Sequence, residues 1–410
     1  MNPIFLDRLK SSCYRKILAA PILLIITSCI ETFEPVTQTF EEILVVEAII
    51  TDELRKQQIL LSKTTPLENN EIEPETDAIV QVTDNVANTY SFSESAPGVY
   101  VSNSEFEAEV GREYALSIET SEGGSYKSGN VTLTGTGQIE EIRAERITNA
   151  NGTDGVAILV DGTGSDSNST FFRYEYEETY QIITPFAINL DLVVVSENPP
   201  VLDTIVKTRE ERVCYNTIGS NRIILSSANN LSQNKVENIQ VHLIARDNPI
   251  LKSRYSILVK QFIHSQEAYS YYETLSRISD LESVFSQLQP GFVEGNIEAI
   301  ENPDKNVIGI FEVASVSNKR IFFNFRDIFQ DGNNPPYFVS CNPDTDFVTT
   351  SPSPNPNEFS VIQRLLNQGY KLISYEEGFF GGINSYTIAP PACGNCTVLG
   401  SNIEPEFWED

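Results

Sequence analysis

The stretch "ILVVEAIITDELRKQQILLSKT" (43–64) decides the fold of this chain. It contains two runs rich in Ile, Leu and Val, 43–51 and 58–64, with a mostly polar segment, 52–57, between them. Short runs that are rich in β-branched residues and bounded by polar residues are typical of β-strands. The stretch therefore predicts two consecutive strands at the start of the folded body.

The same pattern continues to about residue 133. Turn residues such as Gly98, Gly111 and Gly123 separate five further strand-like runs. These runs are "AIVQVTD" (78–84), "TYSFSE" (89–94), "GVYVS" (98–102), "REYALSIET" (112–120) and "SYKSGNVTL" (125–133). About seven short strands with turns at this spacing are typical of two packed sheets. We expect residues 42–135 to form a β-sandwich that resembles an immunoglobulin or fibronectin type III module.

The stretch "TGTGQ" (134–138) marks the expected boundary with a second region, 136–410. That region contains further strand-like runs, among them "FFRYEYEETYQII" (171–183) and "VENIQVHLIAR" (236–246). The predicted fold class is therefore mainly β, with an N-terminal β-sandwich followed by a larger β-rich domain that carries one or two short helices.

The period of the apolar residues changes in 265–288, where they recur at the spacing of a helix. Ser265 is suited to the N-cap of this helix, and Glu267 is favourable in its first turn. A shorter helix is expected at 358–367, with Gly369 suited to its C-cap.

The N-terminus predicts a secretory signal. Four basic residues precede the apolar run Ile17–Ile26, which is too short to span a bilayer because spanning takes about 20 residues. The order Ile26-Thr27-Ser28-Cys29 resembles a bacterial lipobox. This resemblance implies that residues 1–28 are removed and that Cys29 becomes the first mature residue and carries lipid. Residues 29–41 would then be a lipidated tether.

The negative charge of the chain argues against two classes of partner, nucleic acids and anionic lipids. The formal net charge is −29, which makes binding to nucleic-acid phosphates or to anionic headgroups unfavourable. Lipid rather than electrostatics would therefore hold the chain to a membrane. The acidic residues that follow Cys29 resemble the export signal of lipoproteins from Bacteroidota. This resemblance implies the outer membrane, with the protein facing the cell exterior.

Beyond the signal and Cys29, the chain has four cysteines: Cys214, Cys341, Cys393 and Cys396. An even number in an exported chain predicts two disulfides, for which three connectivities exist. We expect Cys341 to bond to one member of the "CGNC" pair and Cys214 to the other. A redox site would need a thioredoxin-like βαβ setting, and a zinc site would prefer a second close pair.

The sequence offers little for catalysis. Its two histidines, His242 and His264, lie in no nucleophile-elbow or zinc-protease motif. The stretch "DGTGSDSN" (161–168) has oxygen ligands but lacks the order of a calcium-binding loop. Adjacent acids such as Glu376 and Glu377 are ordinary in so acidic a chain. We therefore predict no catalytic residues, no metal and no cofactor, and keep a surface hydrolase as the least favoured hypothesis.

Aromatic side chains are the better candidates for binding. Tyr269 lies off the apolar face of the predicted helix, and Phe379 and Phe380 lie in the glycine-rich stretch "EEGFFGGINSY" (376–386). Glycines allow close approach of a partner, and rings can stack on sugar or peptide faces. The simpler interpretation places Tyr271, Tyr272 and one of the two phenylalanines in the core. Tyr269, Phe379 and Phe380 are therefore the expected binding contacts.

The chain also resembles a known family along nearly its whole mature length. The stretches that carry this resemblance are "LVVEAIITDE" (44–53), "GREYALSIET" (111–120), "FFRYEYEETY" (171–180), "SQEAYSYYETL" (265–275), "GNIEAIENPDKNVIGIFEVASV" (295–316) and "PACGNCTVLGSNIEPEFW" (391–408). They resemble a Bacteroidota outer-membrane lipoprotein family known only as a domain of unknown function, typically encoded beside TonB-dependent receptors. The resemblance implies a partner lipoprotein over a receptor barrel, and it brings no catalytic residues.

The favoured hypothesis is a non-catalytic surface lipoprotein that partners a TonB-dependent outer-membrane receptor in ligand capture or uptake. The alternative is a scaffold or accessory subunit of a larger outer-membrane complex. A capture protein should have a concave, aromatic-lined site, whereas a scaffold should have a broad contact surface. A hydrolase would need titratable groups that converge in one cleft.

Overall fold

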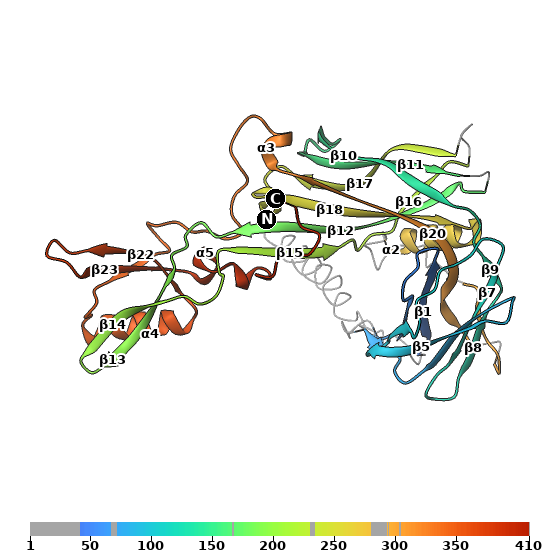
Figure 1. Cartoon of the computed structure of the whole chain (residues 1–410), viewed down its shortest axis with the longest axis horizontal. Coiled ribbons are helices and arrows are strands. Elements are labelled where there is room, and N and C mark those ends of the chain that lie inside the picture. Colours follow the sequence, from blue (N-terminus) through green and yellow to red (C-terminus); the bar gives the residue numbers. More distant parts are fainter. Residues whose placement is uncertain are drawn as a thin grey trace, which may run out of the picture. The chain divides into compact units, whose positions relative to one another are not determined.

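The computed structural model describes residues 42–66, 72–165, 168–229, 234–279, 293, 295–302 and 305–409 (Figure 1). The expected signal peptide, the lipidated Cys29 and the tether lie outside these residues. The described chain is mainly β with a few short helices, which confirms the predicted fold class.

The first region consists of short strands, and those predicted from the sequence are all present. They are β1 (Leu44–Thr51), β2 (Gln58–Lys63), β3 (Glu73–Pro74), β4 (Ile79–Asp84), β5 (Thr89–Ala96), β6 (Val99–Ser102), β7 (Glu113–Glu119), β8 (Ser125–Ser128) and β9 (Val131–Thr132). They pair in the order β1-β2-β6-β5-β4-β7-β8. Alternation places Val46, Ala48 and Ile50 of β1 in a common core with Tyr100 and Leu116.

The second region is built from longer strands. They are β10 (Gly137–Thr148), β11 (Asp154–Gly164), β12 (Phe171–Ile183), β15 (Val213–Gly219), β16 (Ile224–Ser227), β17 (Lys235–Ala245), β18 (Tyr255–His264), β19 (Ile297–Ala299) and β20 (Val307–Phe323). Strands β10, β11 and β17 form one sheet, and β15, β12, β18 and β20 belong to another. Ile158 from the first sheet and Tyr174 and Val259 from the second share one core, so the two sheets pack face to face.

Strand β20 connects the two regions. Its first half runs parallel to β1, from the pair Leu44–Val307 to the pair Thr51–Ala314. Its second half pairs antiparallel with β18. The first region is therefore continuous with a sheet of the second. No local pattern in the sequence predicts this pairing of β1 with β20. The boundary near residue 135 stays a prediction.

A smaller group of elements has its own core. We call it the α4 lobe, and it comprises β13 (Leu190–Glu197), β14 (Pro200–Val206), β21 (Val348–Thr350), α4 (Pro356–Asn367), β22 (Lys371–Glu377) and β23 (Ile383–Ala389). Leu192 and Leu202 pack there with Phe359, Ile362 and Tyr386. The α4 helix is the second predicted helix, and the Asn355 side chain caps its N-terminus. Gly369 follows it with φ +86°, the conformation expected beyond a helix end.

The longest helix of the described residues, α2 (Gln266–Ser279), is the first predicted helix, and 280–288 lies outside those residues. Ser265 caps it, because its hydroxyl accepts a bond from the Ala268 backbone N–H at 3.1 Å. Ala268 and Tyr271 bury one side of the helix against Ile310 of β20. The remaining short helices are η1 (Pro249–Leu251), α3 (Phe325–Ile328), α5 (Pro391–Gly394) and η2 (Cys396–Val398). Within the described residues, no helix has the length and apolarity to cross a membrane.

Candidate functional site

The most unusual surface feature is a pair of phenylalanines at the turn between β22 and β23. The side chains of Phe379 and Phe380 are each 98% exposed. Their ring centroids are 5.5 Å apart and the rings lie nearly perpendicular. Single exposed apolar residues are common, but two adjacent, fully exposed aromatic rings are typical of interaction sites. We call residues 378–382 the aromatic tip.

The backbone of the aromatic tip explains why the rings face solvent. The Gly378 N–H donates to the Gly382 carbonyl at 2.8 Å, and the Gly381 N–H donates to the Gly378 carbonyl at 3.0 Å. Gly381 and Gly382 have φ values of +84° and +82°, which glycine adopts without the strain of a Cβ. These bonds close the chain into a tight local turn, and no described element covers the side chains of Phe379 and Phe380.

The hairpin below the tip is well anchored in the α4 lobe. Leu372 of β22 and Ile388 of β23 are buried against Phe359 and Ile362 of α4. Ile373 and Ala389 belong to a neighbouring small core together with Cys393. The two exposed rings are therefore carried by a packed hairpin.

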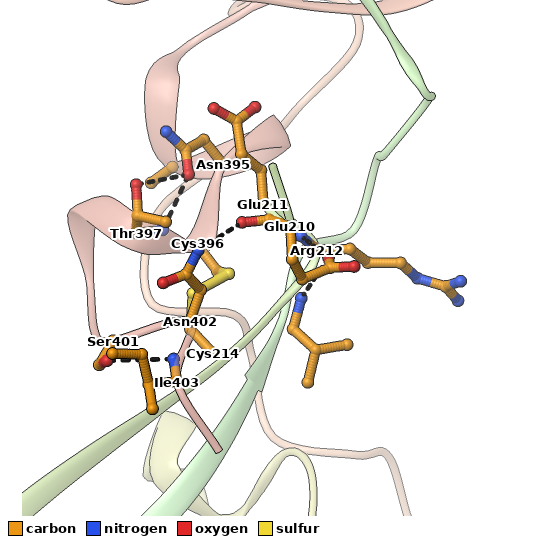
Figure 2. The surroundings of a disulfide bond; sticks show 12 residues. Glu210, Glu211, Arg212, Cys214, Asn395, Cys396, Thr397, Ser401, Asn402 and Ile403 are labelled. Carbon is orange, nitrogen blue, oxygen red and sulfur yellow. Dashed lines mark hydrogen bonds between the residues drawn. A yellow bond between two sulfur atoms is a disulfide. The ribbon is translucent and has the colours of Figure 1, made fainter. Parts of the chain in front are cut away.

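Two disulfides connect distant parts of the chain, as the cysteine count predicted. Cys214 of β15 is bonded to Cys396, and Cys341 is bonded to Cys393, so each member of the "CGNC" pair reaches a distant cysteine. Figure 2 shows the first of these bonds beside the segment that contains Glu211, whose carbonyl accepts the Cys396 N–H at 2.8 Å. Each disulfide closes a long loop, 182 residues for Cys214–Cys396 and 52 for Cys341–Cys393.

Glu211 also organises a buried ion cluster next to this disulfide. Its carboxylate lies 3.0 Å from Lys207 Nζ, 2.6 Å from Arg209 Nε and 2.9 Å from Lys371 Nζ. Burial raises the pKa of the Glu211 carboxyl, but hydrogen bonds from Lys371, Arg209 and Lys207 outweigh burial and lower this pKa to about 2. Because Lys371 begins β22, the cluster fastens the base of the tip hairpin to the segment before β15.

The tyrosines of α2 are packed, in contrast to the aromatic tip. The ring of Tyr269 is half-buried, with its centroid 4.8 Å from that of Phe171 on β12. Tyr271 is buried, and the Tyr272 hydroxyl donates to Glu312 Oε1 at 3.0 Å. Among the described residues, no contact joins Tyr269 to Phe379 or Phe380. The sequence-predicted contacts thus fall at two separate places.

A buried polar cluster lies below α2, and no pattern in the sequence predicts it. Arg173 Nε donates to His264 Nε2 at 3.1 Å, so the imidazole proton belongs on Nδ1, which lies 2.5 Å from Glu312 Oε2. The Arg173 guanidinium also lies 4.6 Å from the ring centroids of Phe262 and Tyr272. Burial raises the pKa of the Glu312 carboxyl, but contacts with His264, Arg173 and Tyr272 outweigh it, so the pKa lies below its usual value.

The other histidine is engaged in a similar way. His242 Nδ1 is 3.0 Å from the Tyr176 hydroxyl, and its Nε2 is 3.3 Å from Glu178 Oε2. Both ring nitrogens of each histidine are thus engaged by other side chains of the described residues. Within the described residues, no group of three or more His, Cys, Asp or Glu side chains is placed to hold a metal ion.

The chain belongs to the family described as "Domain of unknown function (DUF4249)", whose family model matches residues 30–320. The aromatic tip, α4 and three of the four disulfide cysteines therefore lie beyond the matched residues. None of the curated proteins matches the chain. Among solved structures, the chain is similar to a DUF4785 family protein from Legionella pneumophila at 8% identity and a TM-score of 0.16. The match covers 53% of this chain and about half (51%) of that one.

Proposed function

We propose that this chain is a non-catalytic surface lipoprotein that partners a TonB-dependent outer-membrane receptor in ligand capture or uptake. The observation that carries the proposal is the aromatic tip, where Phe379 and Phe380 stand fully exposed on an anchored hairpin. Covering a phenylalanine side chain stabilises an association by about 1.5–3 kcal/mol. The two rings together could therefore dominate a contact with a partner protein, as hot-spot residues do.

The charges beside the aromatic tip favour a protein partner over a lipid surface. Glu376 and Glu377 precede the tip and are exposed, and the whole chain has a net charge of −29. Negative charge at this position opposes insertion among anionic headgroups. It favours an apolar socket with a basic rim, because charge complementarity steers association and fixes its register.

A lipid anchor at Cys29 is the second part of the proposal. The anchor would hold the protein at the outer membrane, and residues 29–41 would let the folded body reach a receptor barrel in the same membrane. Confinement to one membrane raises the effective concentration of the two proteins, so a small contact would be sufficient for stable pairing.

The engagement of both histidines supports a binding role over hydrolysis. His264 accepts a hydrogen bond from Arg173, and His242 lies between Tyr176 and Glu178. A hydrolase that used a histidine base would need one free ring nitrogen facing a nucleophile.

Pull-down in mild detergent followed by mass spectrometry tests the proposal. The native protein should recover a TonB-dependent receptor, and the double variant Phe379→Ser/Phe380→Ser should lose it. Val110→Ser is the matched control, because Val110 is 75% exposed on a turn of the first region.

The results would separate the hypotheses clearly. Recovery of the chain without any outer-membrane protein would refute partnership. Recovery of a larger complex that contains no receptor barrel would favour the scaffold alternative. If the tip variant recovers the receptor as well as the native protein does, the partnership with the receptor is upheld, but the aromatic tip is not its docking site.

A further inference from the structure

A neutral hollow of about 490 Å³ lies where β9, the start of β12 and the start of α2 meet. Its size falls in the range of small-molecule sites, about 300–1,000 Å³. Among its described lining residues, the polar ones are hydroxyls and amides, including Thr134, Asn229, Ser265 and Gln266. We infer that this hollow binds a neutral carbohydrate.

The absence of charge among the described lining residues decides the class of ligand. Of the described residues that line this hollow, none is acidic or basic, although the chain has 57 acidic and 28 basic residues. A site for a phosphate or a carboxylate would present Arg or Lys, and a site for a metal ion would present carboxylates. Hydroxyls and amides both donate and accept hydrogen bonds, which matches the hydroxyl groups of a sugar.

An aromatic pair supplies the apolar part of the site. Phe171 lines the hollow, and its ring centroid is 4.8 Å from that of Tyr269 on α2. The face of a sugar ring carries C–H groups that pack on aromatic rings. The sequence predicted Tyr269 as a binding contact. In this site its ring packs on Phe171 and fixes the position of that side chain.

Two hydroxyls at the hollow have hydrogen-bonding capacity left over. Thr134 Oγ1 is buried and has no hydrogen-bond partner among the described residues. Ser265 Oγ accepts the Ala268 N–H, so its own proton remains available to a ligand. Buried polar groups are normally paired, so a rotation of the Thr134 side chain toward the hollow would bring this hydroxyl to a bound sugar hydroxyl.

A second hollow on the same molecule shows the contrast. The hollow beside β1 and β2 is lined by Glu47, Glu53, Glu175, Arg55 and Lys260, so it suits a ligand with charges of its own. The net charge of −29 also repels acidic glycans from the whole surface. Neutral glycans are therefore the carbohydrates that the neutral hollow favours.

This inference deepens the proposed function by naming the ligand class, but its test does not depend on a receptor. The full chain in mild detergent is applied to a glycan array that carries neutral and acidic glycans. The strongest neutral binder is then titrated by calorimetry against the native protein and its variants. We expect a neutral oligosaccharide to bind, and Asn229→Ala or Gln266→Ala to weaken it about tenfold, the effect of losing one well-formed hydrogen bond.

Thr134→Val keeps the shape of the side chain and should also weaken binding, while Gln368→Ala, an exposed amide on the α4 lobe, should leave it unchanged. Circular dichroism establishes that each variant is folded. No binding to any neutral glycan, binding only to acidic glycans, or equal affinity in all variants would overturn the inference. A failed receptor pull-down would not contradict the inference of a carbohydrate site, because the glycan-binding experiment contains no receptor.

Discussion

The tyrosines of α2 and the phenylalanines of the aromatic tip look alike in the sequence but differ in the structure. Both are clusters of neighbouring aromatic residues with acidic residues close by. Tyr271 and Tyr272 pack on the sheet, and Tyr272 donates to the buried Glu312. Phe379 and Phe380 are each 98% exposed, and the ring contact found for them among the described residues is the one that they make with each other.

This difference shows that an aromatic side chain is buried or exposed according to whether another element offers a surface for it to pack on. A helix of fourteen residues has one side that must be buried, and β20 supplies a surface for it. A five-residue glycine turn has no such side, so its rings stay free for a partner. The packing of α2 depends on the buried polar cluster of Arg173, His264 and Glu312. The position of the aromatic tip depends on the disulfides and the Glu211 ion cluster, which hold the base of its hairpin.

The largest effect on stability should come from the disulfide between Cys214 and Cys396. Cys214→Ser with Cys396→Ser opens a loop of 182 residues, and the chain-entropy model then gives a loss of about 5 kcal/mol. Urea unfolding followed by the fluorescence of Trp408, the only tryptophan, measures this loss. Trp408 is a suitable probe because its ring lies 4.9 Å from that of Tyr215, next to Cys214. An unchanged midpoint would show that packing alone holds the region together.

The next largest effect should come from the polar cluster under α2. Glu312→Leu removes the buried carboxylate that accepts from His264 Nδ1 and from the Tyr272 hydroxyl, and leaving a buried donor unpaired costs about 1–3 kcal/mol for each of the two. The free energy of unfolding, measured in urea by circular dichroism, tests this. Glu298→Leu serves as the control, because Glu298 is exposed on β19. Equal stability of the two variants would mean that the cluster does not support α2.

The ion cluster at Glu211 should give a smaller effect that depends on pH. The pKa of this carboxyl is lowered from 4.5 to about 2, so its stabilising contribution is complete above pH 4.5 and is lost as the pH falls through about 2. Glu211→Gln should therefore lower the free energy of unfolding by about 2–3 kcal/mol at pH 7, and much less near pH 2. Unfolding curves of both proteins across this pH range measure the difference. A gap independent of pH would contradict the assigned ion pairs.

The smallest effect on stability should come from the aromatic tip. Phe379→Ser/Phe380→Ser removes no folded contact outside the turn, so the free energy of unfolding should change by less than about 0.5 kcal/mol. Tyr271→Ala should cost about 3 kcal/mol in the same assay, because this ring is buried under α2. Similar losses for the two variants would erase the distinction between the packed and the open aromatic clusters.

Local patterns in the sequence were sufficient to predict many of the elements. The apolar, strand-like run 43–51 and the alternation in 78–84 predicted β1 and β4, and the cap residue Ser265 marked the start of α2. The cysteine count predicted two disulfides. These features depend on neighbours in the chain or on the number of cysteines, so one sequence carries enough information.

Features that depend on distant residues were not predictable. The parallel pairing of β1 with β20 joins residues more than 250 positions apart, and no local rule selects it. Arg173 and Glu312 look like surface charges in the sequence, yet they pair in the interior with His264. One of the two tip phenylalanines was expected in the core by the simpler interpretation, but both are exposed because the glycines close the turn locally.

The central claim, that the aromatic tip docks on a TonB-dependent receptor, is tested most directly by photo-crosslinking in living cells. A photoreactive phenylalanine analogue replaces Phe380 in the full chain, and a second strain carries it at Val110. We predict a light-dependent adduct between position 380 and a TonB-dependent receptor, and none from position 110. No adduct from position 380, or the same receptor adduct from both positions, would contradict the account.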